Sequence, residues 1–362
     1  MLPIVIGSVT ESSGKSLVWL GMGLRLKADG FKVGFFKPLG ALPTRVDNML
    51  VDEDAVFLKT AIGEEASMES ICPVVLTEEL LTSALKGEVK MSQVRDKVLT
   101  TFSGLSRDRD VMLVHGLGKL SGGSLMGISE LDFVNEVNAR VVFTDRFENL
   151  LETLDGFMYA HGILGDKLIG VIFNLVPQGK QKYIKNVVSP YLKSKGVDTL
   201  GVIHKDPVIG ALPVREMVKA LKGEVLCCED KLDELVEHFM VGAMNMESAL
   251  KYFSRVSNKA VVTGGDRSDV QLAALETPTK CLILTGGFYP NDVILSRARE
   301  TETPVIVVKK DTAWAVEVCE GLASHLQRWS RVKLPRLREV TEREIDFPLL
   351  YKKLGLSPKR PR

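Results

Sequence analysis

Gly7–Ser16, with the sequence GSVTESSGKS, is the segment that decides the fold of the first half of this chain. It follows the apolar run Leu2–Ile6 and precedes a helical pattern over Ser16–Lys27. A strand, a loop of small residues, Gly-Lys-Ser and a helix form the layout of a phosphate-binding loop, because the free N–H groups at a helix N-terminus attract anions. The segment therefore predicts a phosphate ligand beyond the end of the first strand.

Five residues of this loop are the predicted nucleotide-binding residues: Ser12, Ser13, Gly14, Lys15 and Ser16. Small residues let the backbone curl round an anion. Lys15 is expected to neutralise phosphate oxygens, and the Ser16 hydroxyl is expected to be a ligand of Mg²⁺.

The spacing of this loop departs from the usual pattern. A glycine normally stands five positions before Gly14, where this chain has Val9, and Gly7 comes two positions too early. The alternative is a serine-rich turn between a strand and a helix, with an exposed lysine. The position of the loop, directly after the first strand and before an apolar helix, favours a phosphate ligand.

The composition is that of a folded, soluble protein, and the length suits two or three domains. The chain has 362 residues, of which 45% are hydrophobic and 26% charged. The net charge of +1 gives no overall attraction to nucleic acid. No apolar run is long enough for a membrane span, and the five cysteines show no zinc-binding spacing. We therefore expect a cytoplasmic protein without a nucleic-acid or membrane partner.

Short β-branched runs alternate with helical patterns through the first half, which predicts a parallel, doubly wound α/β sheet. Ligands of such a sheet bind at the carboxyl ends of its strands. The predicted strands are Pro3–Ile6, Val33–Lys37, Val111–His115, Val141–Thr144, Leu168–Asn174 and Gly201–His204. The predicted helices are Ser16–Lys27, Asp52–Ile62, Glu148–His161 and Gln181–Lys195.

The α/β pattern restarts near Leu226, so we predict domains at 1–226 and 227–362, with the boundary within Leu226–Leu232. The second domain is expected to be smaller and also α/β. Its predicted strands are Ala260–Thr263, Leu282–Thr285 and Val305–Val308, and its predicted helices are Met240–Phe253, Ser268–Leu275 and Asn291–Glu300.

Four further residues of the first half stand where ligands of a parallel sheet bind. Lys37 ends the second predicted strand, where it either holds an anion or is a solvated strand end. Asp54 lies in the first turn of a helix, where it is either a Mg²⁺ ligand or a residue favoured by the helix dipole. His115 ends another strand, and Asn174 either hydrogen-bonds an adenine edge or makes a turn before proline.

The second half offers a candidate ligand site at two glycine-rich turns. Arg267 either binds a nucleotide phosphate or pairs with a neighbouring aspartate, and the glycines leave room for a ligand to approach the backbone. The candidate residues are Gly265, Asp266, Arg267, Thr285, Gly286 and Gly287.

Together these motifs resemble two known families. The first half is similar to the dethiobiotin-synthetase-like P-loop domain at the N-terminus of long phosphotransacetylases, and the second half is similar to a DRTGG domain, a small CBS-like fold. The resemblance rests on the segments Ser12–Ser16, Phe36–Pro38, Asp52–Ala55, Val114–Gly116, Asn174–Pro177, Val241–Met244, Gly265–Asp269 and Leu284–Pro290.

The resemblance implies roles for these residues. Lys15 and Ser16 would hold the phosphates and Mg²⁺ of ATP or ADP, Asp54 would be a metal ligand, and Asn174 would lie at the adenine. Lys37 would face the substrate side. Dethiobiotin synthetases carry a metal-binding Glu where this chain has His115, which leaves Ser16 and Asp54 as the protein ligands.

Three hypotheses follow. The first is an adenine-nucleotide-binding regulatory or sensor protein, because the metal site is incomplete and acetyl transfer is not expected from this chain alone. The second is an ATP- and Mg²⁺-dependent ligase similar to dethiobiotin synthetase. The third is a non-catalytic interaction module with a vestigial loop. A homodimer is expected because two-fold dimers are the commonest oligomers, and the family suggests an acyl-metabolism enzyme as a partner.

Overall fold

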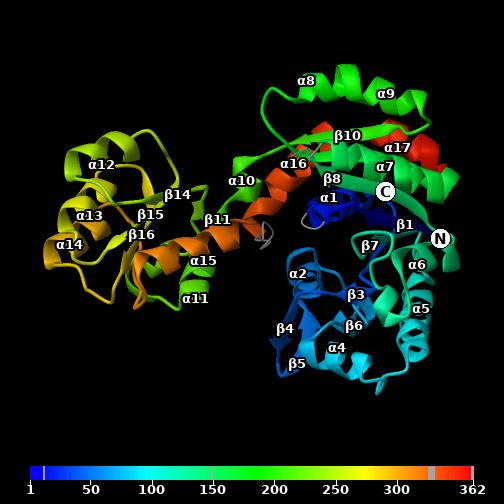
Figure 1. Cartoon of the computed structure of the whole chain (residues 1–362), viewed down its shortest axis with the longest axis horizontal. Helices are drawn as coiled ribbons and strands as arrows, with labels where there is room; N and C mark the ends of the chain where they lie inside the picture. Colours follow the sequence, from blue (N-terminus) through cyan, green and yellow to red (C-terminus); the bar gives the residue numbers. More distant parts are fainter. Residues whose placement is uncertain (11–12, 148–149, 325–330, 360–362) are drawn as a thin grey trace. The chain divides into compact units, whose positions relative to one another are not determined.

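The computed structural model describes residues 1–10, 13–147, 150–324 and 331–359 (Figure 1). The chain forms two compact units. The first unit contains Met1–Lys205 and also the chain from Arg331 onward, whereas the second begins at Asp206 and extends through the intervening segment.

This division differs from the expected domains 1–226 and 227–362. Helix α11 (Val214–Leu221) buries Met217 in the hydrophobic core of the second unit, so the chain has left the first unit by this point. Helices α16 (Leu334–Glu344) and α17 (Phe347–Leu354) return to the first unit, where α16 packs on the first helix of the chain. The apolar side chains of α11 are buried in the core of the second unit, and those of α16 and α17 are buried in the first unit.

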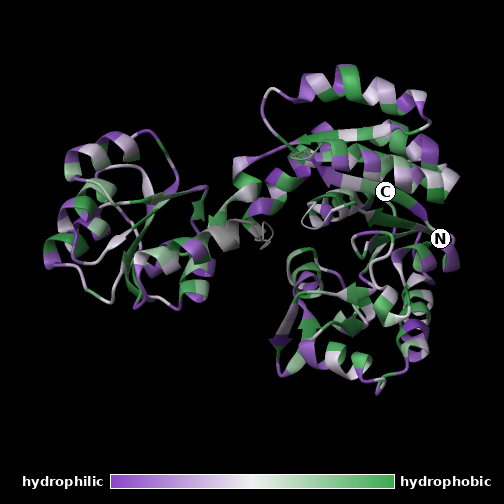
Figure 2. Ribbon diagram, in the orientation of Figure 1, coloured by the Kyte–Doolittle hydropathy of each residue, from purple (hydrophilic) through white to green (hydrophobic). Residues whose placement is uncertain are grey.

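The first unit is built on a six-stranded parallel sheet, which confirms the predicted fold class. The order of its strands is β10-β9-β8-β1-β7-β2. Its strands are β1 (Leu2–Gly7), β2 (Val33–Phe36), β7 (Val111–His115), β8 (Arg140–Arg146), β9 (Leu168–Val176) and β10 (Thr199–His204). The central strands β1 and β7 are mostly apolar and almost fully buried, as expected for strands that are covered on both faces, whereas β8 carries polar residues at its ends (Figure 2).

Helices connect and cover these strands. They are α1 (Lys15–Ala28), α2 (Glu53–Ala61), α3 (Met68–Ile71), α4 (Glu78–Leu85), α5 (Met91–Ser106), α6 (Glu130–Glu136), α7 (Leu150–Leu164), α8 (Gln181–Tyr183) and α9 (Ser189–Ser194). Two short ladders lie beside the sheet: β3 (Leu39–Gly40) pairs with β6 (Val74–Val75), and β4 (Pro43–Val46) pairs with β5 (Met49–Asp52).

The predicted helix Gln181–Lys195 is not a continuous α-helix. Residues Ile184–Val188 form a π-helical turn between α8 and α9. Pro190 lies at the start of α9 and has no N–H group, so it cannot donate to the carbonyl of Asn186 in an α-helical pattern. The start of the predicted helix Glu148–His161 lies outside the described residues.

The second unit has a five-stranded sheet in the order β12-β17-β16-β15-β14. Its main strands are β12 (Glu224–Cys227), β14 (His238–Val241), β15 (Lys259–Gly264), β16 (Thr279–Thr285) and β17 (Val305–Val307), and β12 is antiparallel to β17. Its other elements are α10 (Pro207–Gly210), β11 (Leu212–Pro213), β13 (Leu235–Val236), α12 (Met246–Phe253), α13 (Ser268–Leu275), α14 (Asp292–Glu300) and α15 (Thr312–Ser324).

The predicted helix Met240–Phe253 is wrong at its start. Met240 and Val241 belong to β14, where Met240 lies opposite Val261 of β15. The helix begins at Met246, after Asn245 caps it by accepting a hydrogen bond from the Ser248 amide at 3.0 Å. Pairing of Met240 and Val241 with Val261 and Val262 of β15 extends the strand to Val241.

Within the described residues, every helix is too short or too polar to cross a lipid bilayer.

Candidate nucleotide site at the P-loop

The loop between β1 and α1 ends in a glycine with left-handed backbone geometry. Gly14 has φ 81° and ψ 26°, a left-handed conformation that favours glycine, and α1 starts at the next residue. The Lys15 ammonium donates a 2.8 Å hydrogen bond to the Ser8 hydroxyl at the beginning of the loop. The Ser13 hydroxyl is buried and makes no hydrogen bond to a described residue. Ser12 lies outside the described residues.

Asp145, at the end of β8, holds the first part of this loop. Its carboxylate accepts hydrogen bonds from the amides of Val9 (3.1 Å) and Thr10 (2.8 Å) and from the Thr10 hydroxyl (2.5 Å). The side chain of Asp145 is fully buried. A buried carboxylate that accepts several hydrogen bonds fixes its donors, and here it fixes the segment Val9–Thr10.

Replacing Asp145 by alanine is expected to release the segment Val9–Thr10 and to reduce the stability of the first unit by about 2 to 3 kcal/mol, because charge-assisted hydrogen bonds are lost. Urea unfolding measures the loss, and amide hydrogen exchange at Thr10 measures the release. Asp155→Ala, which removes an exposed carboxylate from α7, is the matched control. Unchanged exchange at Thr10 in Asp145→Ala would contradict this role.

Asn174, near the end of β9, holds the second part of the loop. Its amide nitrogen donates to the carbonyl oxygens of Ser13 (3.0 Å) and Gly14 (3.4 Å). Its amide oxygen accepts a hydrogen bond from the Leu175 amide at 2.9 Å, and the side chain is fully buried. The amide nitrogen of Asn174 is therefore bonded to the predicted phosphate-binding loop, and its amide oxygen is bonded to the next residue of the chain.

His115 ends β7 and contacts Ser16 in the first turn of α1. The distance from its Nε2 to the Ser16 hydroxyl is 3.0 Å, and the distance from its Nδ1 to the Gly116 carbonyl is 3.1 Å. Burial, reinforced by the positive charges of Lys37 and Lys15, lowers the pKa of His115 to about 3. The imidazole is therefore neutral, with Nδ1–H donating to Gly116 and Nε2 accepting from Ser16.

Lys37 is not a solvated strand end. Its ammonium lies 2.9 Å from an Asp52 carboxylate oxygen and 2.7 Å from an Asp54 carboxylate oxygen, and all three side chains are buried. Burial alone would lower the pKa of Lys37, but the two carboxylates raise it overall. Burial also acts against ionisation of Asp54, but Lys37 lowers the pKa of this group below its usual range.

These contacts bring the predicted residues of the first half together at the carboxyl ends of the parallel strands. Among the described residues no group of three or more His, Cys, Asp and Glu side chains forms a metal-binding cluster. The expected metal ligands, Ser16 and Asp54, are engaged with His115 and Lys37 respectively.

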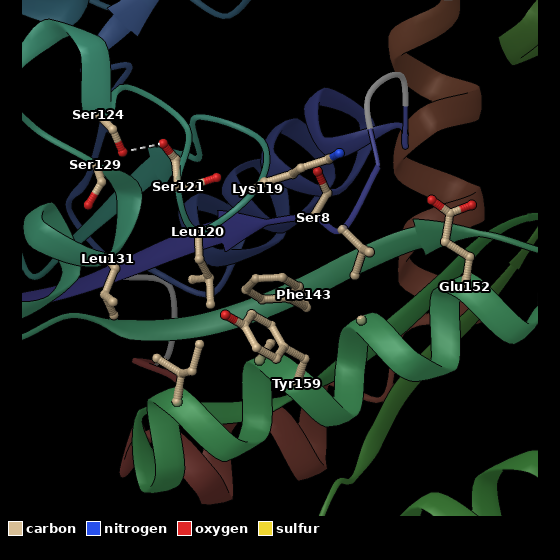
Figure 3. A pocket seen from close by; sticks show the side chains of 14 residues that line it. Ser8, Lys119, Leu120, Ser121, Ser124, Ser129, Leu131, Phe143, Glu152 and Tyr159 are labelled. Carbon is tan, nitrogen blue, oxygen red and sulfur yellow. Dashed lines mark hydrogen bonds between the residues drawn. The ribbon is translucent and has the colours of Figure 1, made fainter.

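A pocket of about 480 Å³ lies beside the loop (Figure 3). Ser8 and Val9 form one wall, α7 forms another with Tyr159, and Phe143 of β8 lies between them. The remaining wall is the segment Lys119–Leu131, which supplies hydroxyl groups and a lysine. The pocket thus combines an apolar interior with polar groups at the start of the P-loop, as small-molecule sites do.

The glycine-rich turns of the second unit also lie side by side. The Gly265 amide donates to the Thr285 carbonyl at 3.0 Å, and Gly286 and Gly287 have φ values of 84° and 73°. Arg267 donates to the Met244 carbonyl at 2.8 Å and pairs with Asp269 at 3.3 Å. These contacts match the structural alternative for Arg267, and Asp266 is exposed beside them.

Comparison with known families agrees with this architecture. The sequence model of the AAA domain matches residues 3–221 of the chain. The chain belongs to this family. The DRTGG domain model matches residues 216–322 of this AAA-domain protein, so both halves of the resemblance drawn from the sequence are confirmed.

Curated relatives of this AAA-domain protein include a phosphate acetyltransferase of Synechocystis sp., which is 24% identical over 97% of the chain and 52% of its own length. An ATP-dependent dethiobiotin synthetase of Caldicellulosiruptor saccharolyticus is 23% identical over 32% of the chain and 48% of its own length. The chain thus spans about half the length of the phosphate acetyltransferases that it matches.

Among solved structures, the chain is similar to the CBS and DRTGG domains of the regulatory region of Clostridium perfringens pyrophosphatase, crystallised with the activator diadenosine tetraphosphate. The identity is 18%, the TM-score is 0.29, and the match covers 42% of this chain and 70% of the other.

Proposed function

We propose that this protein is an adenine-nucleotide-binding regulatory or sensor protein related to the N-terminal region of phosphate acetyltransferases. The observation that carries the proposal is the loop before α1. Gly14 is left-handed, the Lys15 ammonium lies over the loop at Ser8, and the Ser13 hydroxyl is buried without a partner among the described residues. This arrangement offers backbone N–H groups, a hydroxyl and a cation to a phosphate.

Mg²⁺ would enter this site with the nucleotide. The Ser16 hydroxyl and the Asp54 carboxylate are hard oxygen donors of the kind that Mg²⁺ prefers, and both belong to the group around Lys37 and His115. A bound Mg²⁺ would neutralise charge on the phosphate oxygens. Lys15 would hold the phosphates, and Asn174 would keep the carbonyls of Ser13 and Gly14 turned away from them.

Two features of the expected metal site favour a regulatory nucleotide over rapid ATP turnover. The Asp54 carboxylate is paired with Lys37, and the neutral His115 stands where related synthetases carry a carboxylate. A regulatory nucleotide acts by binding two conformations with different affinities, which requires a phosphate site but no rapid chemistry. The turns at Gly265–Arg267 and Thr285–Gly287 are the proposed second ligand site.

The pocket beside Ser8 supports a second candidate function, an ATP-dependent ligase similar to dethiobiotin synthetase. A pocket next to the phosphate loop would let Lys15 and Mg²⁺ act on a small molecule held there. ADP release that depends on an added metabolite distinguishes this candidate from a sensor, which releases none across metabolite mixtures.

A homodimer and an acyl-metabolism enzyme as partner complete the regulatory proposal, and light scattering with and without nucleotide measures the oligomer.

The proposal predicts that ATP or ADP with Mg²⁺ raises the stability of the protein by about 2.7 kcal/mol at a hundred times the dissociation constant. Lys15→Ala is expected to weaken binding by about 10- to 100-fold, because a charge-assisted hydrogen bond to phosphate is lost. Thermal unfolding with ATP, ADP, AMP and GTP measures both effects. Lys32→Ala, which removes an exposed lysine before β2, is the control.

The outcomes separate the hypotheses. Stabilisation that is retained in Lys32→Ala and lost in Lys15→Ala assigns the nucleotide to the P-loop. Stabilisation by a second ligand that is lost only in Arg267→Ala assigns a site to the second unit. If no nucleotide stabilises the wild-type protein, the sensor proposal fails and the interaction module takes its place.

A further inference from the structure

Glu130 is a buried carboxyl group that the functional proposal does not use. It is the first residue of α6, directly after Ser129, which caps this helix by accepting a hydrogen bond from the Asp132 amide at 3.0 Å. Only 1% of Glu130 is exposed to solvent. The first residue of a helix is normally close to solvent, so this burial indicates that the side chain is directed inward.

Two glycines at the ends of adjacent strands make room for this carboxyl group. A Cβ atom placed on Gly116, just after β7, would lie 2.6 Å from Glu130 Oε2, and one placed on Gly7, at the end of β1, would collide with Oε1. The carboxyl group therefore lies at the carboxyl ends of β1 and β7, next to the start of the P-loop and the turn that follows β7. This is the edge at which ligands of parallel sheets bind.

The amides of Leu117 and Gly118 face the carboxyl group, but neither of its oxygens makes a hydrogen bond of good geometry to a described residue. Burial raises the pKa of Glu130 to about 8, against the opposing effects of Lys15 and of the nearby amides of Leu117 and Gly118. The charged group that acts on it from the neighbouring elements is Lys15 of α1, whereas β1 and β7 present glycines. Buried polar groups whose hydrogen bonds are incomplete are rare in folded proteins and occur at functional sites.

The same region adjoins the pocket of Figure 3. Ser129 and Leu131, the sequence neighbours of Glu130, line this pocket, and Phe143 contributes both to the pocket and to the space around Gly7. Glu130 thus lies within electrostatic range of Lys15 and is flanked in sequence by two residues of the pocket wall.

We propose that Glu130 is an acid–base group of the nucleotide site, which takes up a proton from solvent when a nucleotide polyphosphate binds at the P-loop. The inference rests on the proposed function. Phosphate groups bring negative charge next to Glu130 and draw the positive charge of Lys15 to themselves. Both effects disfavour the ionised carboxylate and favour its neutral form. No covalent bond changes in this step, and the proton comes from the buffer.

Isothermal titration calorimetry of Mg·ADP into the full chain tests the inference. The titration is made at pH 8.0 in Tris and in HEPES, whose ionisation enthalpies differ, so that the difference in heat gives the number of protons exchanged. We expect the wild-type protein to take up about half a proton, because a group with a pKa near 8 is half ionised at this pH. Glu130→Gln is expected to bind Mg·ADP with no uptake.

Glu136→Gln is the matched control, because this carboxylate is exposed on the same helix and pairs with Arg95. It is expected to take up as many protons as the wild-type protein. The affinity of wild type and of Glu136→Gln is expected to fall several-fold from pH 7 to pH 9, whereas that of Glu130→Gln stays constant.

The results also separate this inference from the function on which it rests. Nucleotide binding with equal proton uptake in wild type and Glu130→Gln, or with proton release in wild type, overturns the inference and leaves the proposed function in place. No heat of binding in any of the three proteins overturns both.

Discussion

Replacing Lys37 by methionine is expected to destabilise the first unit by about 3 to 5 kcal/mol, the typical effect of removing one partner from a buried ion pair. Lys37 lies within 3.0 Å of oxygens of both Asp52 and Asp54, and the three side chains are buried. Methionine fills a similar volume but leaves two carboxylates facing each other without a cation. Urea unfolding followed by tryptophan fluorescence, to which the buried Trp19 contributes, measures this loss.

The pH dependence identifies the cause of the loss. Without Lys37, burial and mutual repulsion raise the pKa values of both aspartates above those of the unfolded chain. The deficit is therefore largest at neutral and alkaline pH and shrinks as the pH falls toward about 4, where unfolded carboxyl groups also take up protons. Lys32→Met removes an exposed lysine near the same strand and is the control. A deficit that is equal at pH 4.5 and pH 8 would show that packing, not charge, is responsible.

Glu130→Gln is expected to stabilise the nucleotide-free protein at alkaline pH. The folded-state pKa of Glu130 is raised by burial from 4.5 to about 8, so between these values the folded protein holds a proton that the unfolded chain has lost. The contribution of this carboxyl group to stability is therefore fully present below pH 4.5 and is lost at about 1.4 kcal/mol per pH unit up to pH 8. The accumulated loss is about 5 kcal/mol, and glutamine, which does not ionise, avoids it.

Equilibrium unfolding of both proteins from pH 5 to pH 9 measures this difference. The difference between the two proteins should be smallest at pH 5, just above the pKa of the unfolded group, and should grow as the pH rises to 8. Glu136→Gln should run parallel to wild type over the whole range. Parallel curves for wild type and Glu130→Gln would mean that the carboxyl group does not hold its proton in the folded state.

The edge of the sheet at which the site lies could be predicted from the sequence. Polar residues that directly follow apolar runs mark the carboxyl ends of strands, and these ends meet in a parallel sheet. Lys37, His115 and Asn174 were found by this signal. Asp145 carries the same signal, since it follows Thr144, the last residue of a predicted strand, and it was missed.

The partners of these residues could not be predicted in the same way. The sequence shows that the Asn174 amide can donate and accept hydrogen bonds, but it does not show to which groups. In the structure the amide donates to the carbonyls of Ser13 and Gly14. The local sequence around Glu130 does not indicate that this residue is buried. Its carboxyl group fits against Gly7 and Gly116, and these two glycines come together only in the folded sheet. The end of β14, Met240 and Val241, was mistaken for helix because pairing with β15 is a long-range contact.

The late return of the chain to the first unit has a consequence for how the protein is made. Thr341 of α16 packs so closely on Gly21 of α1 that a Cβ atom at Gly21 would collide with it, although more than three hundred residues separate the two. At the usual rate of protein synthesis, α1 leaves the ribosome about 15 to 60 s before α16 does. During this time one apolar side of the helix that follows the P-loop has no cover from its own chain. A nascent chain of this protein is therefore vulnerable to aggregation until its last helices have been synthesised.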